Sequence, residues 1–273
     1  STNSKYFKPK NYLEIQNNLK NSKCTFLARG KGTSYGDASI SNKSKLILTS
    51  ELNKIINFDK EKGILRCQSG ITIEAINKEI VEHKWFLPVT PGTNQASIGG
   101  AIACDAHGKN YKNGTISNFI TFLKIIREDG KLYKCSKTEN SNLFHSSIGG
   151  MGLTGIIVEI EIKLKKIQSQ FMYSTTFVCK DLDDMIEKIN YYKDKFEYIY
   201  SWIDTSCKGL NLGRGFLKLG NHEKLKFKNF VYANKYINFN LFNFRIINLI
   251  TSTIFNKIFF YKNLLNNKKI KIE

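Results

Sequence analysis

PGTNQASIGGAIACDAHGKN, residues 91–110, is a stretch of small side chains with four glycines and a single carboxylate, Asp105. Glycine has no side chain that would keep a large ligand away from the backbone. The stretch ends in His107, Gly108 and Lys109, so a titratable ring and a cation follow the bare backbone. We therefore expect residues 91–110 to press against a ligand and to present His107 and Lys109 beside it.

Two further glycine clusters are GKGTSYGD (residues 30–37) and GGMGLTG (residues 149–155). Backbone N–H groups in such loops can cradle a phosphate. The short hydroxyls of Thr33, Ser34, Thr93 and Ser97 can donate hydrogen bonds to a pyrophosphate. Together the three clusters predict a site for a large, flat, phosphorylated ligand such as a dinucleotide. The alternative, that these glycines serve only turns, stays open at this point.

Two familiar nucleotide motifs do not fit these clusters. Gly30, Gly32 and Gly36 give G-x-G-x-x-x-G rather than the Rossmann G-x-G-x-x-G, and no strand-loop-helix unit follows them. Around Gly108 and Lys109, Ala103 stands where a P-loop needs its first glycine, and Asn110 where it needs Ser or Thr. A different nucleotide-binding architecture is therefore required.

Hydrophobic periodicity places the clusters among strands and helices. We expect strands at 24–29, 45–50, 63–70 and 156–167, a hairpin over 116–135, and helices over 72–83 and 141–148. From about residue 168 the glycine loops largely stop, and the pattern becomes a strand at 171–178, a helix at 181–196 and a strand at 197–206. The chain is long enough for two domains, which we place at 1–166 and 167–273.

The charge balance favours anionic partners. The chain has 42 basic and 23 acidic residues and a formal charge of +19. Such a field favours phosphates, nucleic acid or acidic lipid, although biased codon usage is an equally good source of the lysines. A nucleic-acid-binding protein is a remote alternative, because no recognisable RNA or DNA module accompanies the charge, and we expect no nucleic acid among the partners.

The cysteines and the apolar segments indicate a cytosolic protein. The six cysteines form no C-x-x-C pair, so we expect no metal site, and reduced, mostly buried thiols. The N-terminus has no apolar core of the kind a secretory signal needs. The apolar stretch 236–261 is broken by Arg245 and Lys257, which makes it a poor membrane span and a better part of a domain core.

The three glycine clusters resemble the FAD-binding (PCMH-type) domain of the vanillyl-alcohol oxidase superfamily, and most closely the decaprenylphosphoryl-β-D-ribose 2-oxidase subfamily. YSWIDTS (200–206) and LGRGFLKLG (212–220) resemble that subfamily's substrate domain, so the similarity covers essentially the whole chain. The resemblance implies an α+β fold, with a two-subdomain FAD-binding domain followed by an α+β substrate or cap domain with an antiparallel sheet.

The resemblance also implies site residues. His107, Lys109 and Tyr35 would face the substrate as catalytic residues. Thr33 stands where many broader relatives carry the histidine that tethers the flavin, so the FAD is expected to be non-covalent. The residues implied in cofactor binding are Ala28, Arg29, Gly30, Lys31, Gly32, Thr33, Ser34, Tyr35, Gly36, Asp37, Gly92, Ser97, Ile98, Gly99, Gly100, Cys104, His107 and Ile157.

The implied chemistry is FAD-dependent oxidation of a sugar secondary alcohol to a keto sugar, with hydride transfer to the flavin. The implied substrate is a polyprenyl-phosphate-linked pentose, with a partner reductase completing an epimerisation in cell-envelope polysaccharide synthesis. The implied location is the cytoplasm, with contact at the inner face of the membrane. A second enzyme reading is an aldonolactone or alditol oxidase of the D-arabinono-1,4-lactone oxidase type, which acts on a soluble sugar.

The sequence ends on KKIKIE (268–273), an alternating run typical of the start of a strand. Proteins of the resembled subfamily are considerably longer. We therefore expect the last part of the substrate domain, and with it a candidate catalytic base, to lie outside this chain.

Overall fold

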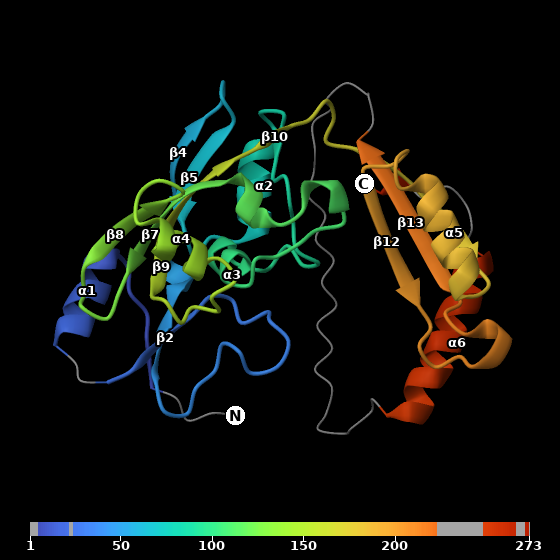
Figure 1. Cartoon of the computed structure of the whole chain (residues 1–273), viewed down its shortest axis with the longest axis horizontal. Coiled ribbons are helices and arrows are strands. Elements are labelled where there is room, and N and C mark those ends of the chain that lie inside the picture. Colours follow the sequence, from blue (N-terminus) through green and yellow to red (C-terminus); the bar gives the residue numbers. More distant parts are fainter. Residues whose placement is uncertain (1–4, 22–23, 223–247, 266–270, 273) are drawn as a thin grey trace. The chain divides into compact units, whose positions relative to one another are not determined.

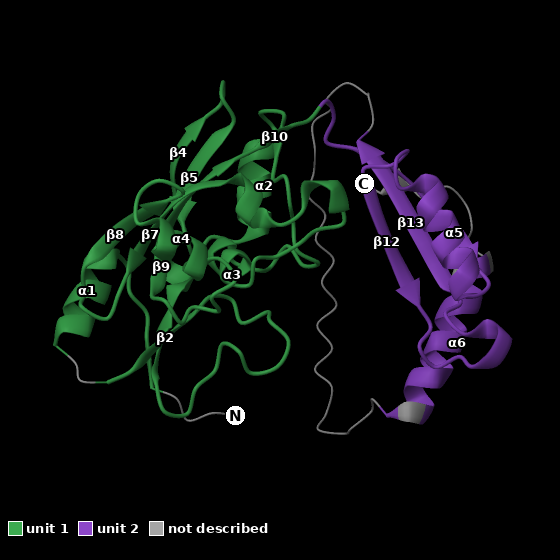
Figure 2. Ribbon diagram, viewed as in Figure 1, with its two compact units in different colours: residues 1–167 green, residues 168–273 purple. Residues whose placement is uncertain are grey.

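The structure, a computed structural model, describes residues 5–21, 24–222, 248–265 and 271–272. They fall into two compact units, unit 1 (residues 1–167) and unit 2 (residues 168–273), which Figure 2 shows in green and purple. Both units combine helices with antiparallel sheets, as the α+β prediction requires. Figure 1 labels the elements.

The main sheet of unit 1 has five antiparallel strands in the order β4-β5-β9-β7-β8. Leu65, Leu123 and Ile160 on its central strands are fully buried, because both neighbours and packed helices cover them. The expected strand at 63–70 and the expected hairpin over 116–135 are confirmed, and the expected strand at 156–167 is confirmed as far as residue 163. In chain order the strands are β4 (Ile55–Asp59), β5 (Ile64–Gln68), β7 (Ile120–Ile126), β8 (Leu132–Ser136) and β9 (Ile156–Lys163).

A second, parallel sheet carries the first glycine cluster. Its strands β1 (Tyr6–Phe7), β3 (Lys45–Leu48) and β2 (Phe26–Arg29) lie in that order. The expected strand at 24–29 is confirmed as β2, which is half-buried because it lies at the edge of the sheet. Helix α1 (Tyr12–Lys20) adds Ile15 and Leu19 to the core beside this sheet.

Helix α2 (Ile73–Val81) begins where the sequence predicts, because Thr72 caps it. The Thr72 hydroxyl accepts a hydrogen bond from the Ala75 N–H at 3.2 Å, which satisfies one of the free donors of the first turn. Ile73, Ile76 and Ile80 then pack into the core of unit 1. After the helix, β6 (Trp85–Phe86) pairs with β10 (Lys165–Lys166), so the predicted strand 156–167 is broken after residue 163.

A six-residue helix, α3 (Ile98–Ala103), lies inside the stretch 91–110, where the sequence predicts no element. Paired glycines disfavour a helix, so packing decides the conformation here. A Cβ atom on Gly99 would stand 2.7 Å from the Ser69 Cβ atom, which means that only glycine lets α3 come this close to the end of β5. Ile98 and Ile102 are fully buried and hold the helix in the core.

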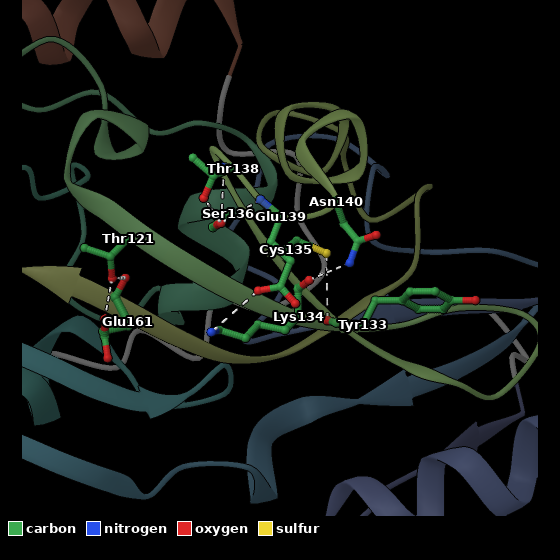
Figure 3. Close-up of polar contacts among 9 residues, drawn as sticks. All are labelled: Thr121, Tyr133, Lys134, Cys135, Ser136, Thr138, Glu139, Asn140 and Glu161. Atoms are coloured by element: carbon green, nitrogen blue, oxygen red, sulfur yellow. Dashed lines mark hydrogen bonds and ion pairs between the residues drawn. The ribbon is translucent and has the colours of Figure 1, made fainter.

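The connection from β8 to helix α4 (Ser141–Ser147) is fixed by short polar contacts (Figure 3). The Ser136 hydroxyl accepts from the backbone N–H groups of Thr138 and Glu139 at 3.3 and 3.0 Å. Asn140 has a left-handed backbone (φ 46°), and its side-chain amide donates to the Lys134 carbonyl at 2.8 Å. Asparagine tolerates this conformation better than most residues. The turn thereby starts α4, which the sequence predicts at 141–148.

Unit 2 is a four-stranded antiparallel sheet with the order β12-β13-β11-β14. Helix α5 (Leu182–Tyr192) supplies Met185 to a small core with Leu217 and Leu219. The predicted strand–helix–strand pattern of residues 171–206 is confirmed. The run at the end of the sequence pairs with Met172 and Tyr173 through Lys271 and Ile272. The strands are β11 (Met172–Cys179), β12 (Tyr198–Ile203), β13 (Gly215–His222) and β14 (Lys271–Ile272).

Helix α6 (Leu249–Leu265) contains the described part of the apolar stretch 236–261; residues 236–247 lie outside the described residues. Phe260 stacks on Phe216 of β13 with ring centroids 5.2 Å apart, so this part of the stretch contributes to the core of unit 2. Over the ranges that the structure describes, none of the helices has the length and apolar character needed to cross a bilayer.

Candidate functional site

A cavity of about 670 Å³ lies within unit 1, where all three glycine clusters meet. Its volume falls within the ~300–1,000 Å³ range of ligand and cofactor sites. Small and hydroxyl-bearing side chains dominate the wall, and Lys31 is the one charged residue among those that line it. The lining residues are Ala28, Gly30, Lys31, Gly32, Thr33, Ser34, Tyr35, Ala38, Ser39, Thr49, Ser69, Pro91, Gly92, Thr93, Ala96, Ser97, Gly99, Gly100, Ala101, Ala103, Cys104, Ala106, Met151, Gly152, Gly155 and Ile157.

The first wall is the loop after β2. The Arg29 guanidinium donates to the Ser39 carbonyl oxygen at 3.1 Å and so ties the two ends of this loop together. Gly32 has φ +65°, and a Cβ atom there would meet the Arg29 guanidinium at 2.3 Å. Between these anchors Thr33, Ser34 and Tyr35 line the cavity and remain exposed.

The second wall is α3 with the loop before it. A Cβ atom on Gly100 would meet only the Ser97 hydroxyl oxygen, at 3.1 Å, and one on Gly92 would meet nothing within 4 Å. Both glycines therefore leave open space on the cavity side. Ser97 is buried and occupies the N-cap position of α3 without making a side-chain capping bond, so its hydroxyl is not committed to the helix.

The third wall is the segment after α4. The N–H groups of Gly149 and Met151 donate to the Ile102 and Ala103 carbonyls at 3.0 and 2.8 Å, which joins this segment to the end of α3. Gly155 has φ +146°, and a Cβ atom there would stand 2.8 Å from the Ile126 carbonyl oxygen. The backbone thus passes too close to β7 for any residue with a side chain, and glycine is required.

Two buried hydroxyl residues that the sequence analysis misses, Thr49 and Ser69, also line the cavity. Each follows directly after a strand, Thr49 after β3 and Ser69 after β5. Neither lies in a glycine cluster, and single serines and threonines are too common to mark a site. A hydroxyl directly behind a predicted buried strand is the one signal that points to them.

The structure brings together most of the residues implied in cofactor binding, and it leaves a few outside the cavity lining. Arg29 supports the first loop instead, and Ile98 is buried in the core of unit 1. His107 and Lys109 are exposed beyond Ala106, and the His107 backbone pairs with Thr115 as an antiparallel bridge. The residues that do not line the cavity are Arg29, Gly36, Asp37, Ile98, His107 and Lys109.

The cysteine in the cavity wall is a protonated thiol at neutral pH. Partial desolvation raises the pKa of the Cys104 thiol although the residue is exposed, and its Sγ atom lies 2.8 Å from the Gly100 carbonyl oxygen. The expectation of mostly buried cysteines holds for Cys67, Cys135 and Cys179, whereas Cys24 and Cys104 are exposed. In the parts of the chain that the structure covers, no three metal-binding side chains gather.

These residues fit a large cofactor with phosphate groups. Glycine backbone at Gly92 and Gly100 allows a ring system to approach closely. Hydroxyls and the Lys31 ammonium can hydrogen-bond and neutralise a diphosphate. The buried Ser69 hydroxyl oxygen has no hydrogen-bond partner among the described residues, so it is available to a ligand in the cavity.

Comparisons with known proteins agree with this fit. Residues 4–136 match the family described as FAD binding domain. The chain is 32% identical over 205 residues to a decaprenylphosphoryl-β-D-ribose oxidase of Mycolicibacterium smegmatis. This alignment covers 73% of the chain and 44% of that protein. The chain is 28% identical to a D-lactate dehydrogenase of Archaeoglobus fulgidus (58% of the chain, 38% of that protein). It is 21% identical to the L-gulonolactone oxidase of Mus musculus (54% and 34%). The chain thus spans less than half the length of each relative.

Proposed function

We propose, because residues 4–136 match the FAD binding domain family, that the chain holds FAD in the unit 1 cavity and oxidises a secondary alcohol of a sugar to a keto sugar. The observation that carries the proposal is the meeting of three glycine clusters around one nearly uncharged cavity. Two of the clusters lie inside the segment that matches the family.

Bound FAD supplies a hydride acceptor, and the chain's own residues bind FAD and orient the substrate. In this proposal the backbone of Gly99 and Gly100 lies against the cofactor, and Thr33, Ser34 and Ser97 donate hydrogen bonds to it. Lys31 offsets the charge of the diphosphate. Unit 1 is then the FAD-binding domain and unit 2 the substrate domain.

His107 and Lys109 are proposed to meet the substrate with Tyr35. Tyr35 lines the cavity and is fully exposed, and the backbone bridge to Thr115 fixes the position of His107 just beyond Ala106. An imidazole can accept a hydroxyl proton near neutral pH, provided that it lies within hydrogen-bond reach. We therefore propose that His107 removes the hydroxyl proton, which replaces the expectation that the base lies outside this chain.

The proposed substrate is a polyprenyl-phosphate-linked pentose. The name of the M. smegmatis relative supports this, as does the charge of +19, which suits a phosphate carrier at an anionic membrane surface. A separate reductase would then consume the keto sugar in cell-envelope synthesis at the cytoplasmic face of the membrane. The name of the mouse relative favours a second candidate, oxidation of a soluble aldonolactone.

Anaerobic mixing of the flavin-loaded protein with each substrate separates these two functions. A polyprenyl-phosphate ribose is expected to bleach the flavin absorbance faster than L-gulono-1,4-lactone at equal concentration. Faster bleaching by the lactone would favour the second function. Bleaching by neither substrate would contradict both.

The FAD is expected to be bound without a covalent link. Thr33 lines the cavity at the position where the resembled relatives carry a tethering histidine, and a threonine hydroxyl does not form that bond. Acid precipitation of the purified protein should therefore leave the yellow colour in the supernatant. Colour that stays with the precipitate would contradict this prediction.

Replacing His107 with alanine is expected to leave FAD bound and to slow the reduction of the flavin by substrate about 100-fold, the usual contribution of a general base. The ring is exposed and does not line the cavity, so cofactor binding should not depend on it. His145→Ala is the matched control, because His145 is an exposed histidine of unit 1 on α4. If the His107 variant loses flavin and the His145 variant does not, His107 has a structural role rather than a catalytic one.

A further inference from the structure

Ser69 has every backbone hydrogen bond that its position allows, and its side chain has none. Its N–H donates to the Val158 carbonyl at 3.1 Å, and its carbonyl accepts from the Gly99 N–H at 2.8 Å. The residue lines the cavity and is only 2% exposed. Its hydroxyl oxygen is buried without a hydrogen-bond partner among the described residues.

Two other buried serine hydroxyls have hydrogen-bond partners, whereas the Ser69 hydroxyl has none among the described residues. The Ser147 hydroxyl donates to the Leu143 carbonyl at 2.7 Å, and the Ser169 hydroxyl accepts from the Phe171 N–H at 3.1 Å. Asn77 and Arg127 also have a buried side-chain atom without a partner, but neither residue lines the cavity. Within the described residues, Ser69 thus combines an unpaired buried group with a place in the cavity wall.

Leaving a buried hydroxyl unpaired is unfavourable, and most buried polar groups in proteins have a partner. A serine hydroxyl has three staggered positions, so rotation about the Cα–Cβ bond can turn the oxygen toward the cavity. The backbone is held by Val158 and Gly99, so only the hydroxyl has to move. The missing partner must then come from whatever fills the cavity.

We propose that the Ser69 hydroxyl forms a hydrogen bond with bound FAD, because none of the described residues pairs with it. This inference rests on FAD being the occupant of the cavity. It adds to the glycine clusters a buried hydroxyl that lies outside them.

Ser69→Ala tests this in the 273-residue chain. Without FAD, the variant loses no hydrogen bond to a described residue, and its unfolding midpoint is expected to stay within about 3 °C of wild type. With FAD, it lacks one hydrogen bond, and the dissociation constant measured by quenching of flavin fluorescence is expected to rise about tenfold. The stabilisation that added FAD gives should shrink accordingly.

Ser147→Ala is the matched control, because this serine is equally buried in unit 1 but already paired. Its apoprotein should be less stable than wild type, and its affinity for FAD should be unchanged. Ser69→Cys places a somewhat larger and more weakly hydrogen-bonding group at the same position, and it should also weaken FAD binding, which guards against a cavity defect in the alanine variant.

An unchanged FAD affinity in both Ser69 variants would overturn the proposal, as would an equal loss of affinity in Ser147→Ala. Failure of the wild-type chain to bind FAD would instead contradict the assignment of the cavity itself. The two failures are therefore distinguishable.

Discussion

Replacing Gly100 with valine is expected to abolish FAD binding while the protein stays folded. A Cβ atom at this position meets only the Ser97 hydroxyl oxygen, at 3.1 Å, so the protein itself has room for most of the new side chain. That room is the cavity, and the two added methyl groups would fill the space where the cofactor approaches the backbone. Overpacking costs up to about 3 kcal/mol, which corresponds to a loss of about 100-fold in affinity.

Flavin occupancy after purification and titration with FAD measure this effect, with two controls. Gly100→Ala adds a single carbon and is expected to lose less affinity. Gly220→Val lies on β13 of unit 2, where a Cβ atom meets the Met172 Cε atom and the Tyr173 carbonyl oxygen at an ordinary 3.4 Å. Its occupancy should match wild type. Equal occupancy in Gly100→Val would mean that the glycine serves only the packing of α3.

Replacing Asp204 with asparagine is expected to destabilise unit 2 by about 3–5 kcal/mol, the usual cost of breaking a buried ion pair from one side. The Asp204 carboxylate is fully buried and accepts from the Arg214 guanidinium at 3.0 Å and from the Ser206 hydroxyl at 2.6 Å. Asn256 of α6 donates to it at 3.1 Å, so this group joins the β12–β13 loop to the helix. The variant leaves Arg214, itself 7% exposed, as an unpaired buried charge.

The same carboxylate predicts how the stability of unit 2 depends on pH. Burial alone would raise the pKa of Asp204, but hydrogen bonds from Ser206, Cys207 and Arg214 together hold it well below its usual value. A lowered pKa in the folded state means that the stabilisation is fully present above the unfolded value of about 3.9 and is lost as the pH falls below it. The wild-type protein should therefore lose stability below about pH 4, and Asp204→Asn should lose less.

Hydrogen exchange of the β12 and β13 amides in urea measures this stability for unit 2 alone. Glu187→Gln is the matched control, because Glu187 is an exposed carboxylate on α5 of the same unit. Its effect should stay within about 0.5 kcal/mol. A similarly small effect for Asp204→Asn would show that the buried pair contributes little to the stability of unit 2.

Elements with a strong local pattern could be predicted from the sequence. The alternating run after Gly155 becomes β9, and Thr72 starts α2 as an N-cap. Helix α3 could not be predicted, because its glycines disfavour a helix and the need for Gly99 arises from a tertiary contact with Ser69. Pairing between distant segments, such as β6 with β10, likewise leaves no trace in a local window.

The cavity could be predicted from the sequence only where glycine marks it. Gly30, Gly92 and Gly100 belong to clusters that stand out, and all three line the cavity. Thr49 and Ser69 reach it because two strands end there, which depends on the tertiary fold. Arg29 shows the converse, since a residue inside the motif supports the loop from behind instead of lining the cavity.

Titration of the full chain with FAD, followed by flavin fluorescence, tests most directly that the unit 1 cavity holds the cofactor. The account predicts saturable binding of one FAD per chain in the wild-type protein and a loss of affinity of about 100-fold in Gly100→Val. Absence of saturable binding in the wild type, or equal binding in the two proteins, would contradict it.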